Sequence, residues 1–226
     1  MYIVLLILVI ILCYSVFPTI YLKLKFKLRK KNDEKVIYLT FDDGPSKYTE
    51  EFLDLFKKYK IKVSFFVVTE FAKLYESTIK KEQKDGHLIC YHSLNHKDYI
   101  KIMPMETITN FNSGLRILNK MGVKIKYFRA PWGRINLTLL RQIKKNNLKL
   151  IIWDVMAQDW EANISSEEIA NRLLKRTKNG SVICIHDGRG KNDAPKRTLE
   201  ALYKVIPIFL EKGYKFETID KLDSNI

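Results

Sequence analysis

Two adjacent carboxylates at the end of an apolar run are the first residues of this sequence that could do chemistry. Asp42 and Asp43 follow the β-prone stretch 36–39 and come just before Gly44-Pro45, a pair of residues that breaks a strand. A buried aspartate is costly unless it is paired or bound to a cation, and neighbouring side chains of a strand point to opposite faces. One carboxylate could therefore hold a metal ion while the other acts on a water. A turn closed by an aspartate side chain is the alternative explanation of the same stretch.

A pair of histidines offers the remaining ligands for such a site. His92 and His96 are two of only four histidines in the chain, and their spacing would place both imidazoles on one side of a helical turn. Two histidines and one carboxylate form a common open hydrolytic metal site, in which the other coordination positions are left for water or substrate. Together with the two aspartates, the pair predicts a metal centre that activates water.

Five short motifs between residues 40 and 187 follow the order of a known protein family. They are Thr-Phe-Asp-Asp-Gly-Pro at 40–45, His-Ser-Leu-Asn-His at 92–96, Arg-Ala-Pro-Trp-Gly at 129–133, Asp-Trp at 159–160 and Ile-Cys-Ile-His-Asp at 183–187. In these motifs the chain resembles the polysaccharide deacetylases, the NodB-homology group also called carbohydrate esterase family 4. The resemblance implies a distorted (β/α) barrel and a metal-dependent hydrolase that removes N-acetyl groups from a glycan.

The resemblance also implies which residues carry the reaction. Asp43, His92 and His96 would hold the metal. Asp42 would act as the general base on the attacking water, and His186 as the general acid that protonates the departing nitrogen. Histidine is the side chain whose unperturbed pKa best suits such proton transfer near neutrality.

Five further residues have supporting roles in the family pattern. Arg129 would pair with the base and favour its ionised form, and Asp159 would orient the acid. The backbone N–H of Trp132 would help to stabilise the oxyanion, and Trp160 would form a wall against a sugar ring, although core packing would also explain that ring. Cys184 stands where the family usually has a leucine that lines the pocket for the acyl methyl group. A smaller side chain there predicts a different fit for the acyl group.

Neither the metal nor the substrate follows from these residues alone. A site with two histidines and a carboxylate accepts several divalent ions, so zinc is the expected ion and cobalt, nickel and manganese are alternatives. The leading prediction for the substrate is peptidoglycan, a chitin-like polymer or another N-acetylated polysaccharide. One alternative is a deacylase or deformylase of a lipid-linked aminosugar at the membrane face, which the basic N-terminal flank and Cys184 favour. The other is a catalytically dead glycan-binding module, which the filled catalytic positions argue against.

Alternating strand and helix patterns from residue 35 onward predict the scaffold that positions these residues. Repeated strand–helix units give parallel strands with helices outside, so we expect an α/β fold, a distorted (β/α) barrel of about seven parallel strands. Most of the motif residues fall at or just after strand ends, where barrel enzymes place their chemistry. The seven candidate strands are 36–41, 63–68, 87–90, 126–129, 149–153, 181–186 and 215–218. The helices expected between them are 49–59, 69–84, 106–121, 137–146, 166–178 and 194–212.

The N-terminal end of the chain is apolar and then basic. Residues 2–22 contain no charged residue and can span a bilayer, and they lack the basic start and the cleavage site of a removed signal peptide. We therefore expect a transmembrane anchor (1–22), in which Pro18 kinks or ends the helix, a basic linker (23–34) and a catalytic domain (35–226). A buried core helix is the alternative for the first segment. The positive-inside rule puts the domain in the cytoplasm, whereas the polymers on which the resembled family acts favour the outside.

Charge and cysteine content add two further expectations. The formal net charge is +15, and subtracting the six basic residues between 23 and 31 leaves +9 (15 − 6) on the remainder. Such a protein is drawn to anionic polymers and lipid surfaces, but the usual nucleic-acid-binding motifs do not accompany the charge, so no nucleic acid is expected as a partner. Cys13, Cys90 and Cys184 match neither a zinc motif nor a disulfide framework. Free thiols are expected, and a bridge between Cys90 and Cys184 is left open.

Overall fold

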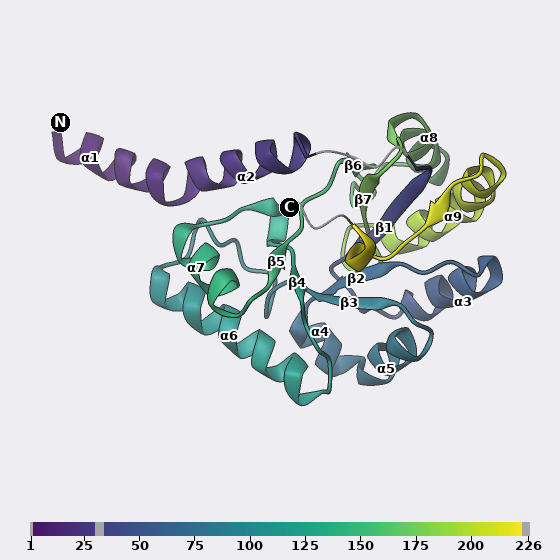
Figure 1. The fold of residues 1–226 in the computed structure, drawn as a ribbon, viewed down its shortest axis with the longest axis horizontal. Helices are drawn as coiled ribbons and strands as arrows, with labels where there is room; N and C mark the ends of the chain where they lie inside the picture. The colour runs from purple at the N-terminus through teal and green to yellow at the C-terminus, as the bar shows by residue number, and fades with distance from the viewer. Residues whose placement is uncertain (1, 30–33, 223–226) are drawn as a thin grey trace.

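The computed structural model describes residues 2–29 and 34–222, and its centre is a curled sheet of parallel strands (Figure 1). Seven strands follow one another in the order β5-β4-β3-β2-β1-β7-β6, and β8 pairs with the start of β1. This sheet confirms the expected α/β fold, a distorted (β/α) barrel of about seven parallel strands. The strands are β1 (Val36–Asp42), β2 (Ser64–Val67), β3 (Leu88–Tyr91), β4 (Tyr127–Phe128), β5 (Lys149–Leu150), β6 (Val155–Met156), β7 (Ser181–His186) and β8 (Lys215–Phe216).

Helices lie outside the sheet, as Figure 1 shows. The predicted helix 69–84 is divided at Tyr75, whose φ of −116° and ψ of 47° interrupt the helical backbone. The other predicted helices are present with ends that differ by two residues or fewer. The helices are α3 (Thr49–Tyr59), α4 (Thr69–Leu74), α5 (Glu76–Lys84), α6 (Pro104–Lys120), α7 (Leu137–Lys145), α8 (Ser166–Arg176) and α9 (Ala194–Glu211), with 3-10 turns η2 (Pro131–Gly133) and η3 (Ile219–Lys221).

The sheet differs from the prediction around Asp154. The expected strand 149–153 is reduced to β5, and a second two-residue strand, β6, follows it. Between the two, the side chain of Asp154 occupies a place in the hydrogen-bond ladder, because its Oδ2 accepts the Val182 N–H at 2.8 Å. A side chain that replaces a backbone partner leaves no trace in a hydrophobic pattern, so the extra strand could not be predicted.

β1 lies in the middle of the sheet, and all seven of its residues are buried. Phe41 packs against Phe52, Phe56 and Phe65, with ring centroids 5.3 to 5.4 Å away. Such aromatic contacts hold α3 and β2 against β1. The end of β1 is therefore a rigid platform for Asp42 and for the residues that follow it.

The N-terminal segment is one long helix that begins at Tyr2 and ends at Lys27. α1 (Tyr2–Ile11) continues through a π-helical turn, η1 (Leu12–Val16), into α2 (Phe17–Lys27). Pro18 does not end this helix: it closely follows the π turn, whose wider backbone makes room for a residue without an N–H.

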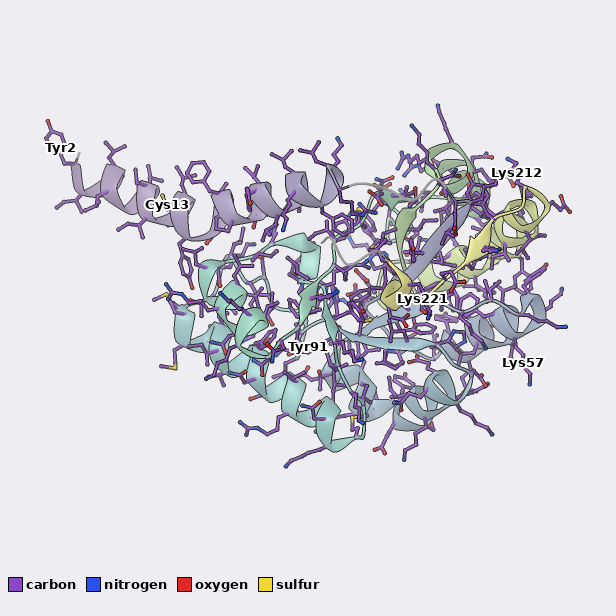
Figure 2. The ribbon with its side chains drawn as sticks, in the orientation of Figure 1. Tyr2, Cys13, Lys57, Tyr91, Lys212 and Lys221 are labelled. Carbon is purple, nitrogen blue, oxygen red and sulfur yellow. The ribbon has the colours of Figure 1, made fainter. Side chains whose placement is uncertain are left out.

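This helix is long and apolar enough to cross a membrane by length and composition. Figure 2 places Tyr2 at its far tip, away from the sheet. The helix runs beyond the predicted anchor to Lys27, and residues 30–33 of the expected linker lie outside the described residues.

Gly114 in α6 makes room for the buried side chain of Tyr91. A Cβ built at Gly114 would lie 2.2 Å from the Tyr91 hydroxyl oxygen, which donates a hydrogen bond to the Phe111 carbonyl oxygen at 2.9 Å. We expect Gly114→Ala to lower the free energy of unfolding by about 1–3 kcal/mol through overpacking, even though alanine favours a helix by about 1 kcal/mol. Urea denaturation measures this change. The control Ser113→Ala, one residue away on the same helix, should change stability by less than about 0.5 kcal/mol; an equally or more stable Gly114→Ala protein would contradict this packing.

Candidate active site

A cavity of about 620 Å³ lies where β1, β3 and β7 end. The carboxyl ends of parallel strands are the usual place for chemistry in barrel folds. Two of the predicted site residues, Arg129 and Asp159, are completely buried and do not line the cavity. The other eight predicted residues line it: Asp42, Asp43, His92, His96, Trp132, Trp160, Cys184 and His186.

Asp43, His92 and His96 come together at one point of this cavity. One possible ligand atom from each lies within 4.8 Å of the others. From Asp43 Oδ1, the distance to His96 Nε2 is 2.9 Å and the distance to His92 Nε2 is 3.4 Å. Both imidazoles therefore point toward the same carboxylate oxygen.

The two histidines do not lie on a helical turn, and our expectation of one was wrong. They belong to the loop that follows β3, where Ser93 and His96 have left-handed φ values of 81° and 57°. The Ser93 hydroxyl oxygen accepts the His96 N–H at 2.8 Å and closes the loop. This tight loop brings the rings to a centroid distance of 5.2 Å, so it achieves by another route what a helical turn would have achieved.

The chemistry of these three side chains fits a divalent cation. His92 Nδ1 lies 2.8 Å from the Arg129 carbonyl oxygen; its N–H donates there, which leaves Nε2 with a lone pair. Asp43 Oδ1 is buried and makes no hydrogen bond with any residue that the structure describes. Burial alone would raise the pKa of Asp43, but the His92 and His96 rings outweigh it and hold the pKa well below its usual value. Burial lowers the pKa of His96, which favours a neutral imidazole beside the Asp43 carboxylate, as metal ligation requires.

Arg129 is completely buried and holds Asp42 in place. Its Nη1 donates to Asp42 Oδ1 at 2.6 Å and to the Thr40 hydroxyl oxygen at 2.8 Å. The second oxygen, Asp42 Oδ2, accepts the Cys184 thiol at 3.2 Å and lies 3.9 Å from His92 Nε2. One oxygen is thus fixed by the guanidinium while the other is directed at the cavity, as a general base requires.

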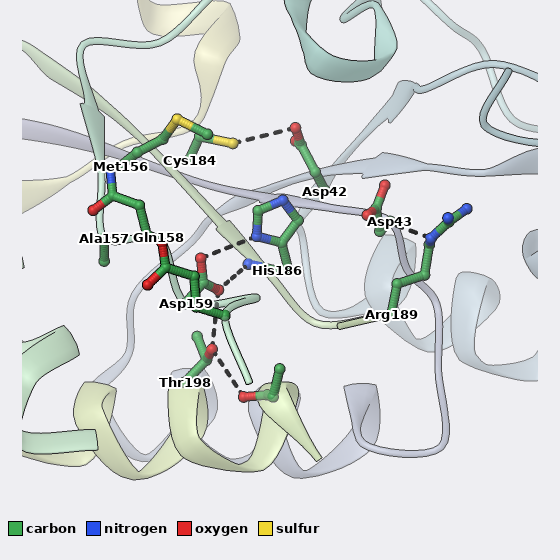
Figure 3. Close-up of polar contacts among 12 residues, drawn as sticks. Asp42, Asp43, Met156, Ala157, Gln158, Asp159, Cys184, His186, Arg189 and Thr198 are labelled. Atoms are coloured by element: carbon green, nitrogen blue, oxygen red, sulfur yellow. Dashed lines mark hydrogen bonds and ion pairs between the residues drawn. The ribbon is translucent and has the colours of Figure 1, made fainter. Parts of the chain in front are cut away.

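His186, Asp159 and Thr198 form a chain of hydrogen bonds that leads away from the cavity wall at His186 (Figure 3). His186 Nδ1 lies 3.0 Å from Asp159 Oδ1, and Asp159 Oδ2 accepts the His186 backbone N–H at 2.8 Å and the Thr198 hydroxyl at 3.0 Å. Burial alone would lower the pKa of His186, but Asp159, Asp43 and Asp42 outweigh it and raise the pKa to about 9. The ring is therefore protonated at neutral pH, which is the form that can act as a general acid.

Trp132 and Trp160 border the cavity next to different histidines. The Trp132 ring is 48% exposed and lies 4.3 Å from the His96 ring, and the Trp160 ring lies 5.3 Å from the His186 ring, both as centroid distances. Cys184 is buried, and both it and Cys90 are free thiols, so no bridge joins them. Burial raises the pKa of Cys184 and keeps the thiol neutral.

Comparisons with known proteins match this arrangement to one family. Residues 29–151 match the family model described as polysaccharide deacetylase. The chain is 33% identical over 195 residues to a peptidoglycan-N-acetylglucosamine deacetylase of Bacillus cereus, a match that covers 84% of this chain and 89% of that protein. The chain belongs to the polysaccharide deacetylase family.

Two further similarities agree with this membership. A chitooligosaccharide deacetylase of Azorhizobium caulinodans is 29% identical over 202 residues, which cover 84% of this chain and 96% of that one. The crystal structure of a peptidoglycan N-acetylglucosamine deacetylase in complex with 4-naphthalen-1-yl-N-oxidanyl-benzamide has a TM-score of 0.78 and 30% identity, over 84% of this chain and 88% of that chain. The predicted family and the predicted class, a hydrolytic polysaccharide N-deacetylase, are confirmed.

Asp187 of this polysaccharide deacetylase has a structural role that the sequence motif did not reveal: it packs against the first motif. The Thr49 hydroxyl donates to Asp187 Oδ2 at 2.5 Å, and burial raises the pKa of Asp187 to about 7. A Cβ at Gly44 would lie 2.3 Å from Asp187 Oδ2, and a Cβ at Gly188 would lie 2.3 Å from the Asp43 carbonyl oxygen. The two glycines are therefore needed so that the first and last motifs can touch.

Other residues of the cavity were missed because they belong to no motif. Trp153 and Met156 line it, and Arg189 lies at its edge with a 43% exposed side chain. Arg189 Nε is 3.8 Å from Asp43 Oδ2, as the dashed line in Figure 3 marks. A single arginine in a loop carries no pattern from which such a position could be predicted.

The pH dependence of the polysaccharide deacetylase should report on Asp159. His186 is protonated below its raised pKa of about 9, so a reaction that needs it as an acid is active below that pH and declines above it. We expect Asp159→Asn to lower the His186 pKa and to move the alkaline decline in acetate release to lower pH by about 1–3 units. The control Thr198→Val keeps the Asp159 carboxylate and removes only its hydrogen bond from Thr198. The alkaline decline in acetate release should therefore move less in this variant. An alkaline limb that stays in place in Asp159→Asn would contradict the pairing.

Proposed function

We propose that this polysaccharide deacetylase is a metal-dependent enzyme that hydrolyses the N-acetyl groups of a glycan, with Asp43, His92 and His96 as the ligands of one divalent cation. The observation that carries the proposal is the convergence of two imidazoles on a buried carboxylate oxygen, all within 4.8 Å. Within residues 2–29 and 34–222 that oxygen makes no hydrogen bond. Zinc is the expected ion, and cobalt, nickel or manganese suit the same donors. A bound divalent cation polarises a carbonyl group and makes a water more acidic.

The proton transfers fall to residues of the protein itself. Asp42 takes the proton of the attacking water on Oδ2, because Arg129 already occupies Oδ1. His186, oriented by Asp159, donates its proton to the departing nitrogen so that the product leaves as an amine. The backbone N–H of Trp132 adds a hydrogen bond to the developing oxyanion.

The walls of the cavity suit a sugar chain. Trp132 and Trp160 offer aromatic faces, against which sugar rings pack well. Cys184 lies beside the base and takes the place of a larger apolar side chain, so this pocket has extra room for the acyl group. Peptidoglycan and chitin-like oligosaccharides are the substrate classes that the names of the relatives support.

The membrane attachment of the enzyme is part of the same proposal. The N-terminal segment 1–22 attaches the enzyme to the membrane, residues 23–34 form its basic flank and residues 35–226 form the catalytic domain; the apolar N-terminal helix supports this division. Wall polymers as substrates favour a catalytic domain outside the membrane, and the basic flank favours the cytoplasm by the positive-inside rule. Digestion of the domain by protease added to intact cells supports the outer placement, and protection until lysis contradicts it.

The test of function is acetate release by the full-length protein in detergent with added zinc. Peptidoglycan fragments, chitooligosaccharides and a lipid-linked N-acetylated aminosugar are compared, with Asp42→Asn protein as the blank. Acetate from at least one of them, well above the blank, is expected. Acetate from the lipid-linked sugar alone would mean that the substrate is a lipid-linked aminosugar and not a wall polymer. The contact of the N-terminal helix with Trp132 favours this second candidate function. Binding of the sugars without any acetate release would mean that the site is dead.

A further inference from the structure

The second half of the N-terminal helix packs against the catalytic domain along one face. Tyr14 donates a hydrogen bond from its hydroxyl to the Thr138 hydroxyl oxygen at 2.7 Å, and the Thr19 hydroxyl bonds both the carbonyl and the N–H of Ile135, at 3.0 and 2.9 Å. In Figure 1 the helix accordingly runs beside α7. The residues on this face recur at helical spacing and are buried or partly buried: Tyr14, Ser15, Pro18, Thr19, Leu22, Lys23, Phe26 and Arg29.

The end of this segment is fixed by a buried ion pair. Arg29 donates to both carboxylate oxygens of Asp154, at 2.9 and 2.5 Å, and the two side chains are only 5% and 7% exposed. The same carboxylate bonds β7. A bidentate pair removed from water on both sides belongs to a packed interface and not to a flexible tether.

The docked helix lies next to the proposed catalytic machinery. Lys23 Nζ donates to the Trp132 carbonyl oxygen at 3.4 Å and lies 5.9 Å from the centroid of the Trp153 ring. A Cβ at Gly133 would lie 3.0 Å from Lys23 Cε, so helix and η2 turn are in close contact. Trp132 in turn packs on His96. The η2 turn, with Trp132, is therefore all that separates α2 from the proposed metal ligand His96.

The opposite face of α2 is apolar and exposed. Its stripe of side chains is between 49% and 81% exposed, and the exposed Lys25 and Lys27 flank it. Apolar residues on one side with lysines at the margin are typical of a helix that lies in the interface of an anionic bilayer. The stripe consists of Phe17, Ile20, Tyr21, Leu24 and Leu28.

The undocked part of the helix is too short to span a bilayer by itself. The twelve residues from Tyr2 to Cys13 are about 18 Å long as a helix, whereas the hydrocarbon core is about 30 Å thick. The docked residues cannot enter that core without drawing Arg29, Asp154 and the attached domain after them. The docked structure is therefore compatible with a helix whose tip dips into the bilayer and whose second half lies at its surface.

We infer that residues 14–29 are an interfacial element held between the catalytic domain and an anionic lipid surface. The inner face binds the domain, the stripe enters the headgroup region, and the cavity beside Trp132 opens close to the lipid surface. The consequence for substrates, which rests on the proposed function, is that the enzyme deacetylates aminosugars attached to the membrane or lying directly on it.

Cross-linking tests whether the helix stays docked in a membrane. Tyr14→Cys and Thr138→Cys are combined with Cys13→Ser in the full-length protein, where Cys90 and Cys184 are buried, and a short bis-maleimide replaces the length of the lost tyrosine ring. In vesicles of phosphatidylglycerol and phosphatidylcholine we expect the same yield of intramolecular cross-link as in detergent. Each single-cysteine protein is the control. A cross-link that forms in detergent and is lost in vesicles would overturn the inference, since it would mean that the helix leaves the domain to span the bilayer.

Fluorescence quenching tests the outer face separately. An environment-sensitive probe is attached to Leu24→Cys on the stripe or, as the matched control, to Leu74→Cys, an exposed leucine of α4, both with Cys13→Ser. Lipids that carry a quencher near the headgroup should quench the probe at position 24 severalfold more than the probe at position 74. Equal quenching at the two positions would overturn the inference.

Neither measurement uses the catalytic reaction, so a failure of the inference can be told from a failure of the proposed function. Docked, quenched protein that releases acetate from no glycan would leave the lipid-facing surface standing and refute the deacetylase activity. Protein that releases acetate but does not cross-link in vesicles would support the deacetylase activity and refute the docked, lipid-facing helix.

Discussion

Replacing His92 with alanine should remove the bound metal and the activity together while the domain stays folded. His92 Nε2 faces Asp43 Oδ1 at 3.4 Å, and its Nδ1 is fixed by the Arg129 carbonyl oxygen at 2.8 Å, so its removal leaves the ion with two of its three proposed ligands. Because a bound cation contributes several kcal/mol to the stabilisation of charge in the transition state, acetate release should fall by about 10³-fold or more. Elemental analysis and an acetate assay on the same sample measure the two losses.

His87 provides the matched control for that experiment. Its ring is also buried, but it packs edge-on against Phe56 and Phe65, with centroid distances of 5.6 Å to each, and its Nδ1 accepts the Val63 N–H. His87→Ala should therefore lower stability and leave the metal content per folded chain unchanged. Metal retained in full by His92→Ala, with circular dichroism showing a folded protein, would mean that the ligand set is wrong.

Asp42→Asn should abolish most of the activity and leave the metal in place. The substitution preserves the shape of the side chain and an oxygen for Arg129 Nη1, but it removes the group that accepts a proton. Loss of a general base costs about 10²–10⁴-fold in rate. The ligands Asp43, His92 and His96 are untouched, so the metal content should equal that of the wild type.

A cost in stability accompanies this substitution and has to be measured with it. Arg129 is 0% exposed, and Asp42 is the carboxylate that pairs with it at 2.6 Å. Removing one partner of a buried pair costs about 3–5 kcal/mol, so the unfolding free energy of Asp42→Asn should fall by an amount of this order. Activity is therefore compared per mole of metal-loaded, folded protein. Acetate release at the wild-type rate on that basis would rule out Asp42 as the base.

The sequence predicted most of the scaffold because its elements carry strong local signals. α3 begins at Thr49 and ends at Tyr59, both as expected, since its apolar residues keep a helical period and Lys60 turns left-handed just after it, with φ of 53°. The long helix expected over 69–84 is two helices, because the break at Tyr75 depends on packing and not on a proline or glycine. β6 was missed because it is only two residues long and follows Asp154, whose side-chain oxygen accepts the Val182 N–H where a backbone oxygen would be expected.

The site was predictable as far as the motifs reach and no further. Eight of the ten predicted residues line one cavity and the other two support them, because each motif sits at a strand end. The geometry of the histidine pair was not predictable, since left-handed residues at Ser93 and His96 replace the expected helical turn. The contact of Lys23 with the Trp132 turn joins positions 109 residues apart and involves no motif, so only the three-dimensional structure reveals it.

The most direct test of the central proposal is a metal titration of the full-length protein after a chelator has stripped it. We expect no acetate release from the stripped protein, and recovery of the full rate when one zinc ion per chain has been added, with no recovery in Asp43→Ala protein. Acetate release at the full rate from protein whose metal content is far below one ion per chain would contradict the account.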